Sequence, residues 1–261
     1  MIVLRGIEKS FGDLPVLRGV NLEIEAGRTT AVIGGSGCGK SVLLKHIIGL
    51  LKPDRGQVLV DGVDITRLPY RELVEVRKKI AMVFQSSALF DSMTVGENLA
   101  MGLQRHTRLK RHEIQKKISD SLALVGLEGI EAKFPAELSG GMKKRAAIAR
   151  ALVMSPEVLL YDEPTTGLDP PRADSINQAI YDLNRKLGVT SVVVTHDMHS
   201  VYRVAEKVAM LDEGVIRFYG TPEELSHCTE PAVMNFLESA RGHEWLERNH
   251  NSGAHHATMD Q

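Results

Sequence analysis

Apolar and polar residues alternate in two stretches near the start of the chain, residues 2–5 and residues 16–25. The segment between these stretches contains Gly12 and Pro15, two residues that favour turns. Alternation with a period of two is typical of a strand with one buried face, and two such strands joined by a turn can pair side by side. The pattern therefore predicts an antiparallel β-subdomain at the N-terminal end.

Short continuous apolar runs follow, and helical patterns separate several of them. The predicted strands are residues 29–34, 57–60, 80–85, 157–163 and 190–196, and a hairpin is predicted at 207–220. A helix is predicted at 40–51, after the first of these strands, and another at about 70–76, before the strand at 80–85. Continuous apolar runs are typical of strands buried on both faces, and alternation of strand and helix favours a parallel sheet. We therefore expect an α/β fold with a mainly parallel sheet. The hairpin is expected to turn at Glu213 and Gly214.

The strand pattern disappears between about residues 86 and 154. Helical spacing replaces it at 94–102, 111–125 and 139–153, with glycine and proline between these segments. The simplest interpretation is an α-helical subdomain inserted into the α/β fold. We expect one domain over residues 1–225 that contains this insertion. An extension over residues 226–261 is expected to be helical at first, to pack on its own chain or on a partner subunit, and to end in a disordered polar tail.

The composition of the 261 residues is that of a globular protein, with 43% apolar and 25% charged residues. Its 32 lysine and arginine residues balance 33 aspartate and glutamate residues. The chain therefore lacks the surplus of positive charge that would indicate nucleic acid as a partner. Two cysteines, Cys38 and Cys228, are too few for a disulfide framework and indicate a reducing compartment. The longest apolar run, residues 42–51, is interrupted by Lys45 and is shorter than the ~20 residues that span a bilayer. We therefore expect a soluble chain that needs a partner for any function across a membrane.

Residues 34–41 read Gly-Gly-Ser-Gly-Cys-Gly-Lys-Ser, the pattern of a phosphate-binding P-loop, and they lie between a predicted strand and a predicted helix. Glycines let backbone N–H groups approach phosphate oxygens closely, and the helix N-terminus attracts anions. Lys40 is expected to reach the β- and γ-phosphates, and the Ser41 hydroxyl is expected to ligate Mg²⁺. Cys38 lies at the same helix start, where the pKa of a thiol tends to fall, although filling a small slot in the loop is a simpler role for it.

A second candidate element ends the predicted strand at 157–163 with two carboxylates, Asp162 and Glu163. Such a pair suits the hydrolysis of a nucleoside triphosphate, because Asp162 can hold Mg²⁺ while Glu163 polarises the attacking water. Successive strand residues point in different directions, so the two carboxylates can divide these roles. Acidic residues often end strands, and only the P-loop in the same chain makes this element informative.

Residues 138–142 read Leu-Ser-Gly-Gly-Met and begin a helix that carries several basic residues. A Ser-Gly-Gly turn at a helix start offers N–H groups and a hydroxyl to an anion, so this turn is a candidate for a second phosphate site. The alternative for this segment alone is an ordinary helix cap followed by a solvated basic face. The basic residues of that helix are Lys143, Lys144, Arg145 and Arg150.

Together these elements resemble the nucleotide-binding subunit of an ATP-binding cassette (ABC) transporter over residues 1 to about 225. In the order and spacing of that family, Gln85 stands at the Q-loop, residues 138–142 at the signature motif, residues 166–169 at the D-loop and His196 at the switch histidine. The resemblance implies a P-loop NTPase core, hydrolysis of ATP with Mg²⁺, and a second copy of the chain packed head to tail. Each ATP then lies between the P-loop of one copy and the signature turn of the other, which accounts for two phosphate sites in one chain.

The resemblance also assigns roles to single residues. Phe11 is expected to stack on adenine, Gln85 to contact Mg²⁺ and the attacking water, and His196 to contact the γ-phosphate. As ordinary alternatives, these three are a core aromatic, a strand end and a histidine with a purely structural partner. The implied nucleotide-binding residues are Phe11, Gly34, Gly35, Ser36, Gly37, Cys38, Gly39, Lys40, Ser41, Val42, Ser139, Gly140, Gly141 and Asp169. The implied catalytic residues are Lys40, Gln85, Glu163 and His196, and the implied metal-binding residues are Ser41, Gln85 and Asp162.

Two positions depart from the usual pattern of the family. Met142 stands where the signature motif usually ends in glutamine, which puts a polar contact to the opposing ribose in doubt. Val42 replaces a second hydroxyl residue after the P-loop, with less consequence because Ser41 supplies the metal ligand.

Residues 84–100 and 140–152 are similar to the ATPases of the maintenance-of-lipid-asymmetry and Mce-linked phospholipid transporters. This similarity implies phospholipid transport from the cytoplasmic face of the bacterial inner membrane, with an integral permease and a lipid-binding carrier protein as partners. The permease is expected to dock on apolar residues that follow the Q-loop, and a local cluster covering the helical insertion is the alternative. These residues are Ala88, Leu89, Phe90 and Met93.

Other functions fit parts of the sequence. The chain could serve another ABC importer or exporter, for toluene, a different solvent or a small solute. A P-loop small-molecule kinase would share residues 34–41 but would leave the Ser-Gly-Gly turn and His196 without a role, and a phosphorylated product would identify it. A mechanical ABC ATPase of DNA repair or of the ribosome usually has long coiled-coil insertions or two cassettes, and the sequence has neither.

Overall fold

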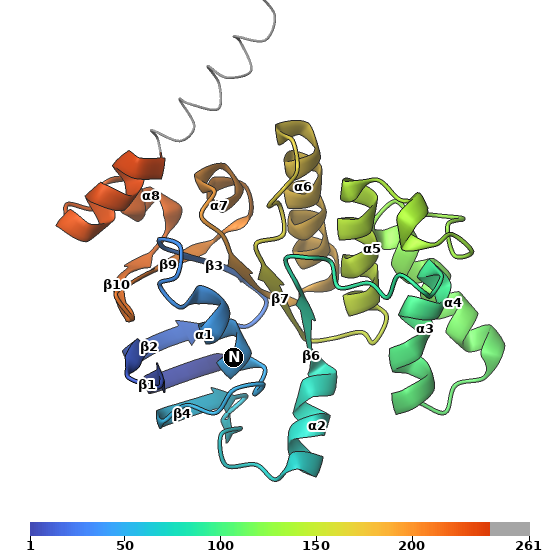
Figure 1. Ribbon diagram of the computed structural model, residues 1–261, viewed down its shortest axis with the longest axis horizontal. Helices are drawn as coiled ribbons and strands as arrows, with labels where there is room; N and C mark the ends of the chain where they lie inside the picture. The colour runs from blue at the N-terminus through green and yellow to red at the C-terminus, as the bar shows by residue number, and fades with distance from the viewer. Residues whose placement is uncertain (241–261) are drawn as a thin grey trace, which may run out of the picture.

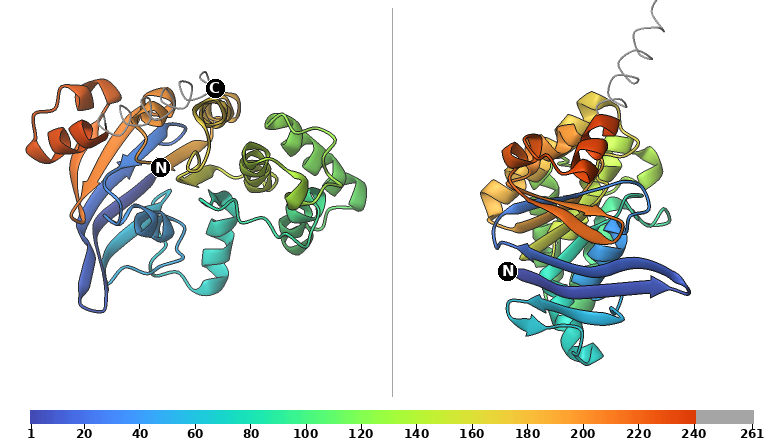
Figure 2. Two further views of the ribbon diagram at one scale, coloured as in Figure 1. Left: turned by 45° about the horizontal axis from the view of Figure 1, so that its top comes forward. Right: turned by 90° about the vertical axis from the view of Figure 1, so that its left-hand side faces the viewer.

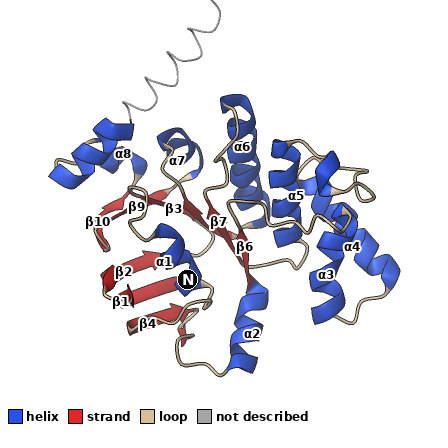
Figure 3. Ribbon diagram, in the orientation of Figure 1, coloured by secondary structure: helices blue, strands red, loops and turns tan. Residues whose placement is uncertain are grey.

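Two β-sheets and the helices around them form the part of the chain that the structure, a computed structural model, describes, residues 1–240 (Figures 1 and 3). The antiparallel sheet and the last helices lie at one end of the molecule, and helices α3 (Val95–His106) and α4 (Arg111–Leu124) lie at the other (Figure 2). The polar tail predicted to be disordered, and the last part of the helix predicted before it, lie outside the described residues.

The first sheet is antiparallel, as the N-terminal pattern predicts. Its strands are β1 (Ile2–Phe11), β2 (Leu14–Ile24), β4 (Arg55–Val60) and β5 (Val63–Asp64), in the order β2-β1-β4-β5. Strand β1 continues well past the predicted stretch of residues 2–5. The register between β1 and β2 shifts between Leu4 and Ile7, so the alternation of apolar and polar residues breaks there although the strand continues.

The second sheet is parallel except for its last strand. Its strands are β3 (Thr29–Ile33), β6 (Ile80–Val83), β7 (Val158–Asp162), β8 (Thr190–Val194), β9 (Lys207–Asp212) and β10 (Val215–Gly220), in the order β10-β9-β3-β8-β7-β6. Strand β10 pairs with β9 in antiparallel fashion, and Glu213 and Gly214 form the predicted turn between them. The predicted α/β class with a mainly parallel sheet is therefore confirmed.

The predicted helices are present, with different ends in some cases. The remaining helices are α1 (Lys40–Ile47), α2 (Tyr70–Lys79), the 3-10 turn η1 (Pro135–Glu137), α5 (Gly140–Leu152), α6 (Pro170–Leu187), α7 (Met198–Val204) and α8 (Pro222–Ser226). The prediction that the first helix extends to residue 51 is wrong, because the helix ends at Ile47. Gly49 then adopts a positive φ of 68°, a conformation that ends helices and that glycine adopts at little cost.

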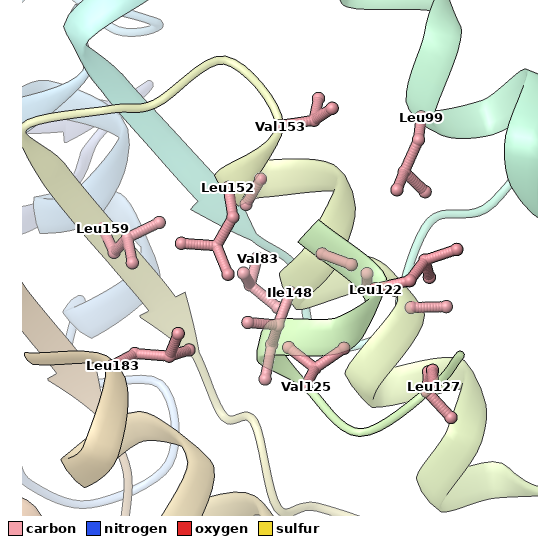
Figure 4. Packing of buried hydrophobic residues seen from close by; sticks show 14 of the residues in the cluster. Val83, Leu99, Leu122, Val125, Leu127, Ile148, Leu152, Val153, Leu159 and Leu183 are labelled. Atoms are coloured by element: carbon pink, nitrogen blue, oxygen red, sulfur yellow. The ribbon is translucent and has the colours of Figure 1, made fainter. Parts of the chain in front are cut away.

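The helical insertion shares its core with the parallel sheet. Within the described residues, no strand lies between β6 and β7, and α3, α4 and α5 occupy this interval. A single cluster of buried side chains joins Leu99 and Leu122 in the insertion, through Ile148 of α5, to Leu159 of β7 and Leu183 of α6 (Figure 4). Helix α5 therefore packs against both the other helices of the insertion and the sheet, so its first turn has a defined place relative to both.

The C-terminal helices pack on their own chain as far as the structure describes them. Residues 231–240 are helical, and Val233 is fully buried in a cluster that includes Leu225 of α8 and Val201 of α7. In residues 1–240 no helix has the length and apolar character that crossing a membrane requires.

Candidate functional site

Three neighbouring strands of the parallel sheet end at the same edge and carry the predicted chemistry there. Residues 34–41 follow β3, Asp162 ends β7, and His196 lies two residues after β8. The register places Val194 of β8 opposite both Val32 of β3 and Asp162 of β7. Parallel strands direct their carboxyl ends to one edge, which is where α/β folds bind ligands. The fold therefore gathers the P-loop, the two carboxylates and the histidine around one place.

The backbone of the P-loop requires glycine at particular positions. Gly34 has a φ of 150°, and a Cβ atom at this position would lie 2.1 Å from the carbonyl oxygen of Leu211 in β9. Gly39 has a φ of 107° and caps the first turn of α1. The loop can therefore lie against β9 and enter α1 in this form only with glycine at these two positions.

Lys40 and Ser41 place a cation and a hydroxyl at the start of α1. The Lys40 ammonium is buried and donates to the carbonyl oxygens of Gly34 and Gly35, at 2.8 Å each. The Ser41 hydroxyl donates to a carboxylate oxygen of Asp162 across 2.8 Å. A buried ammonium in a cradle of exposed backbone N–H groups is suited to the charge of a triphosphate.

The donors at this place also fit Mg²⁺. Mg²⁺ prefers one or two protein oxygen ligands and completes its coordination with water and substrate phosphates. Ser41 and Asp162 supply a hydroxyl and a carboxylate side by side. Among residues 1–240 there is no group of three or more histidine, cysteine, aspartate or glutamate side chains that could hold a metal ion on its own. The site thus offers the few ligands that a metal bound together with phosphate requires.

Glu163 is held by neighbours on two sides. Its side chain is 12% exposed, and a carboxylate oxygen lies 2.9 Å from Nδ1 of His196, whose side chain is 64% exposed. The Thr166 hydroxyl donates to the same carboxylate across 3.2 Å. Glu163 also has a positive φ of 49°, which is costly for a residue other than glycine and is common at functional sites. Strand β7 ends one residue earlier than predicted, because this turn redirects Glu163 away from the strand.

The interaction of Thr166 with Glu163 was not predicted from the sequence, although Thr166 belongs to the expected D-loop. The short spacing of three residues between Glu163 and Thr166 was the available signal.

Burial raises the pKa of the Cys38 thiol, and the nearby charge of Lys40 only partly opposes this effect. The expectation that the helix start lowers the pKa of the Cys38 thiol is therefore wrong. A thiol with a raised pKa carries less thiolate at neutral pH, so Cys38 is a poor nucleophile in this conformation.

The signature turn lies away from the P-loop of its own chain. Ser139 caps α5, and its hydroxyl accepts from the backbone N–H of Met142 at 3.3 Å. A Cβ atom on Gly140 would lie 3.5 Å from Leu168, so this turn borders the D-loop. Within residues 1–240 no hydrogen bond joins this turn to residues 34–41, and α1 and α5 stand apart (Figures 1 and 2).

The structure gives the other predicted residues different exposures and partners. Phe11 ends β1 and is 47% exposed, with the Lys9 ammonium 5.7 Å from its ring centroid, so it is no core aromatic. Asp169 caps α6 by accepting from the backbone N–H of Arg172 at 2.9 Å. Val42 is half-buried and packs against the core beneath the antiparallel sheet.

Gln85 lies two residues beyond the end of β6, not within the strand as predicted, and it is exposed. Of the residues that follow it, Phe90 is 51% exposed, whereas Leu89 and Met93 are half-buried. A cleft of about 370 Å³ opens near this segment and is lined by residues of α2, β6, α3 and α5, among them Arg77, Arg105 and Arg150.

The family model described as "ABC transporter" matches residues 17–166, more than half of the chain. The chain belongs to the ABC transporter family. It is an ATPase that acts on ATP together with Mg²⁺, and the arrangement of the P-loop, Asp162 and Glu163 around one sheet edge agrees with this activity.

Individual relatives differ in what their names say they transport. The chain is 43% identical over 240 residues to the "Probable ribonucleotide transport ATP-binding protein mkl" of Mycobacterium leprae, covering 92% of this chain and 69% of that protein. It is 40% identical over 238 residues to the "Intermembrane phospholipid transport system ATP-binding protein MlaF" of Haemophilus influenzae, covering 91% of this chain and 90% of that protein.

A solved structure with the same fold is that of the ATP-binding cassette MJ0796, a dimer in a post-hydrolysis state with bound ADP and phosphate. The TM-score is 0.78 and the sequences are 34% identical, with 85% of this chain and 99% of that chain covered. The predicted P-loop NTPase core with an antiparallel β-subdomain and a helical insertion is therefore confirmed.

Proposed function

We propose that two copies of this chain pack head to tail and enclose two ATP molecules, each between the P-loop of one copy and the signature turn of the other. The observation that carries this proposal is the separation of two phosphate-binding helix starts in one chain. Residues 34–41 lie beside Asp162, whereas residues 139–141 border the D-loop, and within residues 1–240 no hydrogen bond joins them to the P-loop or to Asp162 and Glu163. A second copy would supply the missing turn. The dimeric state of the MJ0796 structure supports this arrangement.

In this dimer the side chains divide the work of hydrolysis. Lys40 and the N–H groups of the P-loop hold the phosphates, and Ser41 and Asp162 hold Mg²⁺, which neutralises phosphate charge when bound. Glu163 orients the attacking water and accepts its proton at a carboxylate oxygen. His196 and Thr166 hold that carboxylate in place through the contacts described above.

The remaining predicted residues complete the two halves of the site. Gln85 contacts Mg²⁺ and the water, and His196 also contacts the γ-phosphate. Phe11 stacks on adenine with its exposed ring. Ser139, with Gly140 and Gly141, binds the ATP of the opposite copy with its hydroxyl and the helix start. The remaining members of the nucleotide site are Gly34, Gly35, Ser36, Gly37, Cys38, Gly39, Val42 and Asp169. Loss of the γ-phosphate removes a group that both copies hold, and the dimer then opens.

We also propose that the cassette comprises residues 1–225 with its helical subdomain at 86–154, and that residues 226–261 form an extension. The dimer acts on a separate permease that docks near Ala88, Leu89, Phe90 and Met93. The exposed ring of Phe90 supports this place, because an apolar side chain that stays exposed in the monomer suits a partner surface.

The proposed cargo is phospholipid, moved so as to maintain the lipid asymmetry of an outer membrane. The match to MlaF extends over about nine tenths of both chains, and it supports this choice. The complex would then lie at the cytoplasmic face of a bacterial inner membrane and include a lipid-binding carrier protein. A second candidate cargo is ribonucleotide, which the name of the mkl relative at 43% identity favours.

The experiment is to purify the chain with its permease from membranes and to reconstitute the complex in liposomes that contain labelled phospholipid. We expect MgATP to move the labelled lipid, and we expect Glu163→Gln in the same complex to bind ATP without moving it. Hydrolysis of ATP without lipid movement, together with uptake of labelled ribonucleotide, would instead support the second candidate. A Glu163→Gln complex with the normal rate of hydrolysis would contradict the role of Glu163 whatever the cargo.

A further inference from the structure

Two cations of helix α5 reach the segment that carries Gln85. The sequence allows a solvated basic face on this helix, but the Lys144 side chain is only 6% exposed. Its ammonium donates to the main-chain carbonyl oxygen of Gln85 across 2.5 Å. The Arg150 guanidinium donates to the carbonyl oxygens of Ala88, at 2.5 Å, and of Ser87, at 3.3 Å. One helix thus supplies donors to three carbonyl groups within four residues.

The backbone of this segment adopts a conformation that needs such support. Ser87 and Ala88 have positive φ values of 63° and 47°, and neither is glycine. Left-handed conformations cost free energy for residues with a Cβ atom and persist where surrounding contacts fix them. Ser87 is also buried, so its backbone has no free access to water. The bonds from Lys144 and Arg150 are the side-chain contacts that hold these carbonyl groups in the described part of the chain.

Burial of the Lys144 ammonium indicates a role beyond packing. A buried cation loses hydration, and this loss lowers the pKa of Lys144, while the charge of Glu163 acts in the opposite direction. An apolar side chain would fill the same space without this cost. The ammonium therefore stays in a place that is costly for it, bonded to the carbonyl group of Gln85 and within the electrostatic influence of Glu163.

We propose that Lys144 is a positioning residue that fixes Gln85 in its working place through the Gln85 carbonyl group, with Arg150 holding the residues that follow. The inference rests on the role proposed above for Gln85. Helix α5 begins at the turn that binds the ATP of the opposite copy, and it is rigidly packed along its length. Movement of that turn is therefore transmitted to Gln85, and through residues 87 and 88 to the proposed permease surface at Phe90.

The test measures steady-state hydrolysis of ATP by the full-length chain with Mg²⁺. Lys144→Met removes the charge and keeps most of the side-chain volume, and we expect kcat to fall about tenfold with KM for ATP nearly unchanged. Lys144→Arg keeps a cationic donor and is expected to recover most of the rate. Lys143→Met is the matched control, because the Lys143 ammonium has no side-chain hydrogen bond or ion pair to residues 1–240, and its rate should stay normal. A purely structural lysine would change the melting temperature without this pattern in kcat and KM.

A double variant separates this inference from the proposed function. Gln85→Ala should lower kcat, and Lys144→Met should then cause no further loss, because its effect passes through Gln85. If Gln85→Ala lowers kcat but Lys144→Met leaves it unchanged, or if the two losses multiply, the positioning role of Lys144 is wrong and the role of Gln85 stands. If Gln85→Ala has a normal rate, the proposed role of Gln85 is wrong and this inference is overturned with it.

Discussion

Neighbouring residues of the same type can have different chemistry in this protein, because burial differs between them. Lys143 and Lys144 are adjacent in the sequence, yet only Lys144 is buried and bonded to a loop carbonyl group. Cys38 lies at a helix start that should favour its thiolate, but burial raises its pKa instead. Charged and polar groups lose hydration when they are buried, and this loss outweighs the weaker field of a helix end.

His46 in α1 is a buried histidine whose pKa we expect to affect stability. Its Nδ1 atom lies 2.7 Å from the carbonyl oxygen of Val42, and its Nε2 atom is buried with no hydrogen-bond partner among residues 1–240. Burial lowers its pKa below the ordinary value of 6.5. The folded state therefore holds His46 neutral while the unfolded state binds a proton. The resulting stability is present above pH 6.5 and is lost as the pH falls from there toward the lower pKa of the folded state.

Urea unfolding at several pH values between about 5 and 7.5 checks this expectation. In the unmodified chain the free energy of unfolding should fall as the pH drops below 6.5, and in His46→Gln this fall should be smaller, because glutamine does not titrate. His112→Gln, at an exposed position in α4, is the control and should behave like the unmodified chain. An equal fall with pH in His46→Gln would assign the acid sensitivity to other groups.

Helices α6 and α7 are joined by a buried polar contact next to His196 in the sequence. The Asn177 amide in α6 donates to the Ser200 hydroxyl in α7 across 2.9 Å, and both residues are fully buried. The Ser200 hydroxyl in turn donates to Asp197, which directly follows His196 in the sequence. A short chain of hydrogen bonds therefore connects α6 to the segment that carries His196.

Removing the central hydroxyl of this contact should destabilise the fold. Ser200→Ala leaves the Asn177 amide without its partner, and an unpaired buried polar group costs about 1–3 kcal/mol. For a domain of this size we expect the melting temperature to fall by roughly 2–10 °C. Ser191→Ala is the matched control, because Ser191 is equally buried but its hydroxyl has no partner in the described part of the chain, so its loss should be neutral or slightly stabilising. Similar melting temperatures for the two variants would show that the bond between α6 and α7 contributes little.

The whole molecule has two proposed nucleotide-binding edges that one chain cannot bring together. The P-loop edge lies at the ends of β3, β7 and β8, and the signature turn lies at the start of α5. Because α5 packs in the same core as β7 and α6, the turn cannot swing over to the P-loop without breaking that core. This rigidity is the physical reason to expect a complete site only between two copies.

Mixing two inactive variants tests this expectation. Lys40→Ala removes the P-loop cation, and Ser139→Arg blocks the signature turn, so each variant alone should have little ATPase activity. A mixed dimer combines the intact P-loop of the Ser139→Arg chain with the intact signature turn of the Lys40→Ala chain. We expect the mixture to recover part of the rate of the unmodified protein, measured as phosphate release at equal total concentration. A Ser139→Arg chain that is fully active by itself would contradict a shared site.

The sequence predicted the elements whose pattern is local, and it was less accurate at their ends. The antiparallel N-terminal strands, the helical insertion and the turn at Glu213 and Gly214 are present as predicted. The strand predicted to end at Gln85 ends at Val83, and the helix predicted to end at residue 51 ends at Ile47. Ile48 and Phe84 continue the apolar pattern past these ends because they pack against the core, so hydrophobicity alone does not show where the backbone leaves the helix or strand.

The sequence by itself determined the order of elements, the P-loop and the pair Asp162 and Glu163, because these depend on residue type and on short spacings along the chain. The tertiary structure decided which distant groups meet: Ser41 with Asp162, Glu163 with His196, and Lys144 with the carbonyl group of Gln85. These contacts depend on strand order and on the burial of each side chain. Both are set by the packing of the whole chain, and no local pattern of residues contains them.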